Sequence, residues 1–340
     1  MRRAFPSSIP PISSISSISS LAVACALAAA ACAPARPETT GDSPAAIELR
    51  VQPDDGPPAL AALIAGARRS IAVEVYLLTE GELIDALVAA RAGGREVTVV
   101  LEQHPFGAPG ANDAAFARLA QAGVDVAWSS DRFALTHTKL IVVDGARAAV
   151  MTANLTHAGL TTNREYIAFD DDPDDVAAAG SVIAADRASA GAAPAARGRL
   201  VTSPETARAA LLPLMAGAER QLRVEMEELS DAGAVATLVA AAARGVAVTV
   251  VAPATDRAPA TSAALGRLVD AGVRVRALSA PAVHAKAIVA DGRRLYVGSI
   301  NLTAASLDRN REVGVIVEDA GAAARVERTI DGDAAVGAPP

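Results

Sequence analysis

Lysine is almost missing from this chain of 340 residues, which meets nearly all of its need for positive charge with arginine. The two lysines present, Lys139 and Lys286, each follow a histidine by two positions and precede an aspartate by five. Lysine offers a compact, rotatable ammonium, whereas arginine offers a wide planar fork. A pocket that needs one point charge against a phosphoryl oxygen accounts for this pattern better than a surface ion pair does.

Cysteine and aromatic residues are also scarce. The only cysteines are Cys25 and Cys32, and aromatic residues make up 3% of the chain. No disulfide can form in the sequence that follows Cys32, so the stability of that part must come from packing. The low aromatic content predicts cores built from Val, Leu, Ile and Ala rather than from stacked rings.

Positive charge is in deficit as well, with a formal net charge of −7 and no basic stripe along the sequence. The overall field of such a protein repels polyanions. A local groove can still bind nucleic acid, so this balance weighs against a nucleic-acid substrate without removing it.

The N-terminal segment has the features of an export signal. Arg2 and Arg3 supply positive charge, and the apolar run over residues 21–31 is too short for a membrane helix. The run ends in A-A-A-C, which places Cys32 where a bacterial lipoprotein would be cleaved and acylated. Cleavage at an ordinary small-residue site is the alternative. We therefore expect a signal over 1–32, a tether over 33–44, and a protein either held in the bacterial cell envelope or secreted.

What the chain does contain is a duplicated set of polar residues. Both copies read N-L-T and then N-R-E after the aspartate, and corresponding residues are 147 positions apart. The first set is His137, Lys139, Asp144, Asn154, Asn163 and Glu165, and the second is His284, Lys286, Asp291, Asn301, Asn310 and Glu312. Agreement at this many positions indicates an internal repeat.

Hydrophobic periodicity repeats in the same order. In the first copy it predicts strands over 71–76, 97–101, 124–128, 139–143 and 146–151, with helices over 81–93 and 111–122. In the second it predicts strands over 222–227, 246–251 and 273–278, with helices over 234–244 and 260–271. Such alternation is typical of α/β units with a mainly parallel sheet. We expect a first domain over 45–185, a linker over 186–199, a second domain over 200–329 and a frayed tail over 330–340.

The repeated side chains suit a phosphoryl group. Residues two apart on a strand project from the same face, so each histidine points the same way as its lysine. An imidazole nucleophile, a positive charge and an asparagine amide are the groups that displacement at phosphorus requires. One copy supplies half of such a mechanism, and two copies facing each other would supply both the nucleophile and the proton donor.

The pattern H-x-K-x-x-x-x-D followed by G-S-x-N resembles the phospholipase D superfamily, and the duplication resembles its two-motif members. The second copy matches fully through Gly298, Ser299 and Asn301, whereas the first has Met151 and Thr152 at the Gly and Ser positions. The resemblance implies two tandem α/β repeats packed about a pseudo-twofold axis, with the active site at their interface. It also implies a monomer that is an internal pseudo-dimer.

The resemblance further implies a reaction through a phosphohistidine. His137 would attack phosphorus, and His284 would protonate the departing alcohol and then activate water. The non-bridging oxygens would be held by Lys139, Lys286, Asn154 and Asn301, with the hydroxyls of Thr152 and Ser299 beside them. Glu165 and Glu312 would orient the imidazoles. No metal or other cofactor is implied, and the sequence offers no convincing metal-ligand cluster.

The two aspartates have two interpretations. Asp144 and Asp291 belong to the motif and could act directly in the reaction with the histidines and lysines. Each is also followed by glycine, and Asp-Gly is a strong signal for a hairpin turn. Asn163 and Asn310 are better explained as capping or turn residues.

Three functional classes follow. The first is an exported phosphodiesterase of the phospholipase D type that hydrolyses the distal phosphodiester of glycerophospholipids at a membrane surface, or transfers it to an alcohol as a cardiolipin synthase does. The second is a metal-independent endonuclease of the same superfamily. The third is a non-catalytic phosphate-binding module, against which both intact His–Lys pairs argue. No obligate protein partner is evident.

Overall fold

The computed structural model describes residues 46–189 and 198–340, which belong to one compact unit, Ser43–Pro340. The expected signal and tether, including Cys32, and residues 190–197 of the expected linker lie outside the described residues. Within the described part of the chain, no helix combines the length and the apolar character needed to cross a bilayer.

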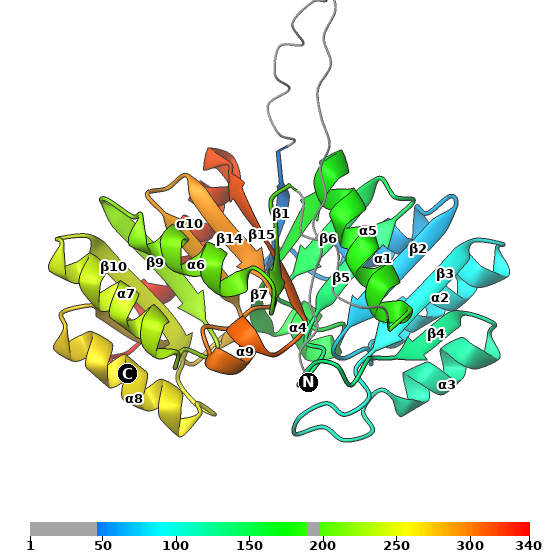
Figure 1. Ribbon diagram of the computed structural model, residues 1–340, viewed down its shortest axis with the longest axis horizontal. Coiled ribbons are helices and arrows are strands. Elements are labelled where there is room, and N and C mark those ends of the chain that lie inside the picture. Colours follow the sequence, from blue (N-terminus) through cyan, green and yellow to red (C-terminus); the bar gives the residue numbers. More distant parts are fainter. Residues whose placement is uncertain (1–45, 190–197) are drawn as a thin grey trace, which may run out of the picture. The chain divides into compact units, whose positions relative to one another are not determined.

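The first repeat begins with elements that the hydrophobic pattern did not predict and continues with those that it did (Figure 1). Its strands are β1 (Glu48–Gln52), β2 (Ser70–Val75), β3 (Glu96–Leu101), β4 (Asp125–Trp128), β5 (Lys139–Val143), β6 (Arg147–Met151) and β7 (Asn163–Asp170). Its helices are α1 (Pro58–Ala65), α2 (Gly81–Ala92), α3 (Asp113–Gln121), α4 (His157–Thr161) and α5 (Pro173–Arg187).

The second repeat follows the same order with one additional short strand. Its strands are β8 (Leu200–Ser203), β9 (Gln221–Met226), β10 (Ala247–Pro253), β11 (Arg274–Leu278), β12 (Ala282–Val283), β13 (Lys286–Ala290), β14 (Arg294–Gly298) and β15 (Glu312–Glu318). Its helices are α6 (Ala207–Ala216), α7 (Ala232–Ala243), α8 (Pro259–Asp270), α9 (Ala304–Asp308) and α10 (Ala320–Val336).

The α/β class and the tandem repeats are as predicted, but the expectation of mainly parallel sheets is wrong. The first sheet has the order β1-β7-β6-β5-β2-β3-β4 and the second β11-β10-β9-β13-β14-β15-β8. Only β2-β3-β4 and β9-β10-β11 pair in parallel along these orders, and the remaining neighbours are antiparallel. The parallel strands are joined by crossover helices, whereas β5-β6 and β13-β14 are joined by tight turns, which permit only antiparallel pairing.

The cores are arranged in layers around the two sheets. A central core takes side chains from both sheets and from α5 and α10. One outer core lies under α1, α2 and α3, and the other under α6, α7 and α8. Figure 1 shows α6 and α7 on one face of the second sheet and α10 on the other. These cores consist largely of Val, Leu, Ile and Ala, as the composition predicts.

Helices cover much of the expected tail and the region that leads into the expected linker. The expectation of a frayed tail over 330–340 is wrong, because α10 continues to Val336 and the side chains of Ile330 and Ala334 are buried in the central core. The region before the linker forms α5, which begins at Pro173 after an N-cap from Asp172 and ends at Arg187. Alanine-rich sequence is a strong helix former, and in both segments burial of one face adds to that preference.

Candidate active site

The two His–Lys pairs lie at equivalent places in the two sheets. Lys139 is the first residue of β5 and Lys286 is the first residue of β13. Each lysine pairs in register with the last residue of the neighbouring strand, Val75 in β2 or Met226 in β9. The site therefore lies at the carboxyl ends of the parallel strands, the edge where open α/β sheets bind their ligands.

Each histidine is held by a glutamate from the other repeat. Nδ1 of His137 lies 2.9 Å from Oε2 of Glu312, and Nδ1 of His284 lies 2.7 Å from Oε1 of Glu165. Both glutamates are fully buried. The sequence predicted that these glutamates orient the histidines, but it gave no reason to expect that the pairs would cross between the repeats.

Backbone hydrogen bonds also cross between the two repeats. His137 N–H donates to the carbonyl of Arg311 at 2.8 Å, and His284 N–H donates to the carbonyl of Arg164 at 3.3 Å. Each arginine immediately precedes the glutamate that holds the same histidine. In addition, β12 pairs with β7 through Ala282 opposite Asn163. The reciprocal contacts place one site at the interface of the two repeats, as the pseudo-twofold arrangement requires.

Both lysines are fully buried and lie against the histidine backbone. Lys139 Nζ donates to the carbonyl of His137 at 2.8 Å, and Lys286 Nζ donates to that of His284 at 2.6 Å. Burial and the charge of Lys286 lower the pKa of Lys139 to about 7. An ammonium so constrained gains strongly from an anion that enters the site, because the anion restores the interaction that water no longer supplies.

His137 has the character of a neutral nucleophile. Burial and the charges of Lys139 and Lys286 hold the pKa of His137 well below its usual range. The ring of Tyr76 meets the imidazole edge to face, with centroids 4.8 Å apart. Burial raises the pKa of Glu312 to about 7, against the opposing effect of Lys139. The imidazole is thus fixed in orientation and kept free of a proton on one nitrogen.

Glu227 is a site residue that the sequence interpretation missed. It directly follows β9, and its Oε2 lies 2.5 Å from Nζ of Lys286 and 3.6 Å from Nε2 of His284. Burial acts to raise the pKa of Glu227, but the charges of His284 and Lys286 outweigh it and lower the pKa well below the usual range. The available signal was the repeat alignment, in which the strand that ends at Tyr76 in the first copy ends at Glu227 in the second.

The two motif asparagines differ in their surroundings. Asn301 accepts a hydrogen bond from the backbone of Glu228 at 3.1 Å and donates to Glu227 at 3.4 Å. Asn154 is buried at the equivalent place, and its Oδ1 has no hydrogen-bond partner among the described residues. Only Asn301 is therefore seen in contact with the charged groups of the site.

The hydroxyls of Thr152 and Ser299 make hydrogen bonds within the protein, and their binding of phosphate stays a prediction. Both residues are fully buried. Thr152 donates to Glu165 and accepts from the backbone of Tyr166, while Ser299 bonds to the backbone of Val313 in β15. These hydroxyls support the strands that carry the two glutamates.

The Gly position of the motif is also used for strand packing. A Cβ atom on Gly298 would lie 2.3 Å from Cα of Gly314 on the neighbouring strand. In the first repeat the corresponding pair is Met151 and Ile167, and both side chains lie in the outer core. Met151 therefore points away from the site and does not obstruct it.

Asp144 and Asp291 lie outside the site, which corrects their placement among the catalytic residues. Asp144 follows β5 at the end opposite Lys139, and its carboxylate accepts from the backbone N–H groups of residues 68–70. Asp291 accepts from those of residues 219–221. Both aspartates and the glycines after them have positive φ, between 55° and 68°. The hairpin-turn interpretation is the one that these contacts support.

The other repeated residues have structural roles. Thr156 and Thr303, from the two N-L-T segments, cap α4 and α9 by accepting from Gly159 and Ser306. Asn310 donates to Glu312 at 3.2 Å. No group of three or more His, Cys, Asp or Glu side chains within 46–189 and 198–340 is arranged to hold a metal ion.

A pocket of about 180 Å³ opens beside His284. Three carboxylates, Glu227, Glu228 and Asp256, line it together with Arg257 and Asn163. Its charge balance is acidic, so the space next to the proposed proton donor favours a neutral or positively charged group over a polyanion.

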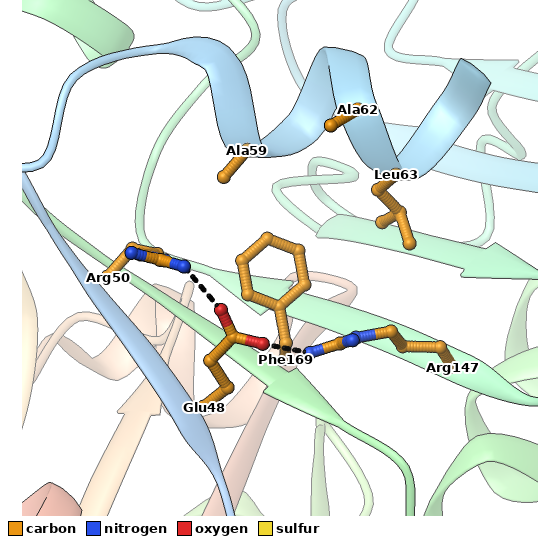
Figure 2. A pocket seen from close by; sticks show the side chains of 7 residues that line it. All are labelled: Glu48, Arg50, Ala59, Ala62, Leu63, Arg147 and Phe169. Atoms are coloured by element: carbon orange, nitrogen blue, oxygen red, sulfur yellow. Dashed lines mark hydrogen bonds and ion pairs between the residues drawn. The ribbon is translucent and has the colours of Figure 1, made fainter. Parts of the chain in front are cut away.

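A separate pocket of about 290 Å³ lies between α1 and the strands β1, β6 and β7. Figure 2 shows Glu48 between Arg50 and Arg147, which both pair with it, beside the ring of Phe169. This pocket contains none of the repeated polar residues, and both of its arginines are already paired with Glu48, so we assign it no part in the reaction.

The comparisons with known proteins agree with this arrangement. The family model described as "Cardiolipin synthase, PLD-like domain" matches residues 60–185 and 211–334. No curated protein sequence matches the chain.

Solved structures align with this chain at low identity, and the first two described here share its fold. Polyphosphate kinase from Porphyromonas gingivalis aligns at 16% identity with a TM-score of 0.65, over 84% of this chain and 50% of the kinase, so the chain spans half the length of that protein. Phosphatidylserine synthase from Haemophilus influenzae aligns at 12% identity with a TM-score of 0.63, over 84% and 87%. Nuc from Salmonella typhimurium, a phospholipase D family member, is 25% identical over 42% of this chain and 96% of its own, with a TM-score of 0.39.

Two α/β repeats that hold one His–Lys site between them define a phospholipase D-like fold. Because the family model covers both repeats and most of the sequence, the chain belongs to this PLD-like domain family of the phospholipase D superfamily. Members of the superfamily are phosphodiesterases or phosphotransferases.

Proposed function

We propose that the protein is an exported phosphodiesterase of the phospholipase D type, which cleaves the distal phosphodiester of glycerophospholipids through a phosphohistidine. The observation that carries this proposal is the crossed arrangement of His137–Glu312 and His284–Glu165, with a buried lysine beside each histidine. It provides two oriented imidazoles and two cations around one position.

In the first step His137 attacks phosphorus. Glu312 occupies the Nδ1 side of this imidazole, so Nε2 is the nitrogen left to form the N–P bond. The bond from phosphorus to the head-group oxygen breaks, and that oxygen takes a proton from His284. Lys139 and Lys286 hold the non-bridging oxygens, where negative charge builds up in the transition state.

In the second step water replaces the departed alcohol. His284 accepts a proton as the water oxygen attacks phosphorus, and the N–P bond breaks to restore His137. Glu165 on Nδ1 of His284 keeps Nε2 directed to the position of the departing and entering oxygens. If another alcohol takes the place of water, the same step transfers the phosphatidyl group.

Two observations favour a lipid substrate over nucleic acid. The pocket beside His284 carries more carboxylates than basic groups, which opposes a polyanion. The net charge of −7 acts in the same direction. The phosphatidylserine synthase and the cardiolipin synthase description among the similar proteins both concern phospholipids, and they support phosphatidyl transfer as the second candidate.

Export is part of the proposal and rests on the sequence of residues 1–32. The positive end, the short apolar run and Cys32 in A-A-A-C favour either a lipoprotein of the bacterial envelope or a secreted protein. In either place the phospholipid of a membrane surface is the proposed substrate, and we propose that the chain acts as a monomer.

The test is to incubate the purified protein, with EDTA present, with mixed phospholipid vesicles and separately with single- and double-stranded DNA. We expect release of head group and formation of phosphatidic acid. An added primary alcohol reveals transfer if a phosphatidyl alcohol forms. His137→Ala and His284→Ala serve as controls and should both lose turnover.

Each other outcome selects another class. Cleavage of DNA with intact lipid would move the protein to the nucleases. Binding of phosphate without turnover of either substrate would identify a non-catalytic phosphate-binding module. Full activity of either histidine variant would overturn the two-histidine reaction.

A further inference from the structure

In the second repeat, the negatively charged Glu227 contacts the groups that are proposed to bind phosphate. The carboxylate of Glu227 reaches Lys286 at 2.5 Å, His284 at 3.6 Å and Asn301 at 3.4 Å. Lysine, histidine and asparagine are the residue types that the reaction assigns to the phosphoryl group. Glu227 thus occupies part of the position that a phosphoryl oxygen would take on this side of the site.

The first repeat has no such charge at the equivalent position. Tyr76 follows β2 as Glu227 follows β9, and its ring lies beside His137. Lys139 Nζ lies 5.1 Å from the centroid of that ring. The pseudo-twofold arrangement is therefore broken at this position, and the difference is one of charge.

The position of Glu227 is fixed by the strand that precedes it. Its backbone N–H donates to the carbonyl of Ala285 at 3.0 Å, next to Lys286. The side chain is 29% exposed, so the carboxylate reaches from the pocket beside His284 to the buried ammonium. An entering phosphoryl group must either replace Glu227 as the partner of Lys286 or bind Lys286 together with it. In both cases the carboxylate of Glu227 stays close to the charge of the phosphoryl group.

We propose that Glu227 is a specificity-determining residue that makes the site accept singly charged phosphodiesters and reject doubly charged phosphomonoesters. This inference rests on the proposed phosphodiester chemistry. A diester carries one negative charge, whereas a monoester carries between about 1.5 and 2 at neutral pH. The additional charge of the monoester is repelled by Glu227 at short range in a partly buried site, where such repulsion is strong.

The same repulsion favours the release of product. Hydrolysis converts the singly charged diester into phosphatidic acid, a phosphomonoester, so the charge that Glu227 opposes is created by the reaction itself. Glu227 would then limit product inhibition without a large effect on the binding of the substrate.

The test measures anion binding without turnover. Inorganic phosphate and dimethyl phosphate are titrated into the native protein, Glu227→Gln and Glu227→Tyr by calorimetry at pH about 8, where inorganic phosphate carries close to two charges. We expect both variants to bind inorganic phosphate about ten-fold more tightly, with a clearly smaller gain for dimethyl phosphate. Glu227→Tyr copies the first repeat and keeps the test decisive if the glutamine variant folds poorly.

Glu228→Gln is the matched control because Glu228 is the next residue and lines the same pocket. It should change the preference between the two anions much less. Equal gains for both anions, no gain, or weaker binding of inorganic phosphate to the Glu227 variants would overturn the inference. Lipid turnover with an unchanged anion preference would reject this inference alone, whereas a changed preference without lipid turnover would reject only the lipid substrate.

Discussion

Lys139 and Lys286 are buried to the last atom, and this explains why a chain rich in arginine keeps a lysine at each position. Each ammonium donates to the carbonyl of the histidine two residues before it. A guanidinium is wider and cannot make the same hydrogen bond within the space that the ammonium occupies. The composition of the sequence therefore pointed correctly to two constrained positions.

From this we predict that Lys139→Arg and Lys286→Arg lose activity although they keep the charge. The larger head group would displace the phosphate or the histidine by about 1 Å, for which a loss of about a hundred-fold in kcat is expected. The measurement is phosphodiester turnover together with a thermal melt that verifies folding. Folded arginine variants with native turnover would show that charge alone is sufficient.

Glu225 is a buried carboxyl group in β9, and it has a consequence for stability. Burial and the charge of Asp333 raise the pKa of Glu225 to about 8, and Tyr166 donates a hydrogen bond to it. The folded protein thus retains a proton that the unfolded chain loses at lower pH. This contribution to stability is complete below the unfolded pKa and is lost as the pH rises through about 8.

We predict that the free energy of unfolding falls between about pH 5 and about pH 9, with at most about 1.4 kcal/mol per pH unit from this group. Glu225→Gln should flatten the slope because glutamine does not titrate. Urea unfolding of both proteins across this range measures it. Parallel slopes for the two proteins would assign the pH dependence to other groups.

At the scale of the elements, the strands and helices around the repeated motifs were predictable. The Val-rich run over 97–101 is β3 almost residue for residue, and the helix expected over 81–93 is α2. The alternation of apolar residues carries this information locally. It carries none about strand direction, so the antiparallel pairs of β5, β6 and β7 became known only from the structure.

The site was predictable to a similar degree. The repeated histidines, lysines and glutamates come together as expected, because the repeat itself marks them. Glu227 stands where the first copy has Tyr76, so identity between the two copies could not mark it, and only the difference at this aligned position could. The exchange of Glu165 and Glu312 between repeats depends on how the two sheets face each other, which no local pattern reports.

The turn after β5 gives a prediction at this scale. Asp144→Ala removes an acceptor from three backbone N–H groups and places alanine at positive φ. We expect a loss of about 1 kcal/mol in stability with kcat close to native. Asp144→Asn, which tolerates positive φ, should lose less. A collapse of kcat in a stably folded Asp144→Ala would restore the aspartate to the catalytic group.

At the scale of the whole described unit, the C-terminal helix is tied to the first repeat. Arg164 lies on β7 and makes two hydrogen bonds to Asp333 on α10, at 2.6 Å and 3.1 Å. The same arginine supplies the carbonyl that accepts from His284. The helix that was expected to be a tail thus supports the position of a proposed catalytic residue.

We predict that Asp333→Ala destabilises the protein by about 3–5 kcal/mol, because it leaves a buried guanidinium without its main partner. Asp331→Ala is the control, since Asp331 lies on the same helix, is 42% exposed and pairs with Arg223. Its cost should be below about 1 kcal/mol. Chemical denaturation of both variants measures their free energies of unfolding. Equal losses of stability in the two variants would contradict a role for the burial of the Arg164–Asp333 pair.

The crossed glutamates have a consequence for how the protein responds to dilution. Neither repeat contains a complete set of groups for the reaction, as each imidazole depends on a carboxylate from the other half of the same chain. A protein that assembled such a site from two separate single-repeat chains would lose activity at low concentration by mass action. Covalent linkage removes that dependence, so specific activity here should stay constant down to the lowest enzyme concentrations that an assay can follow.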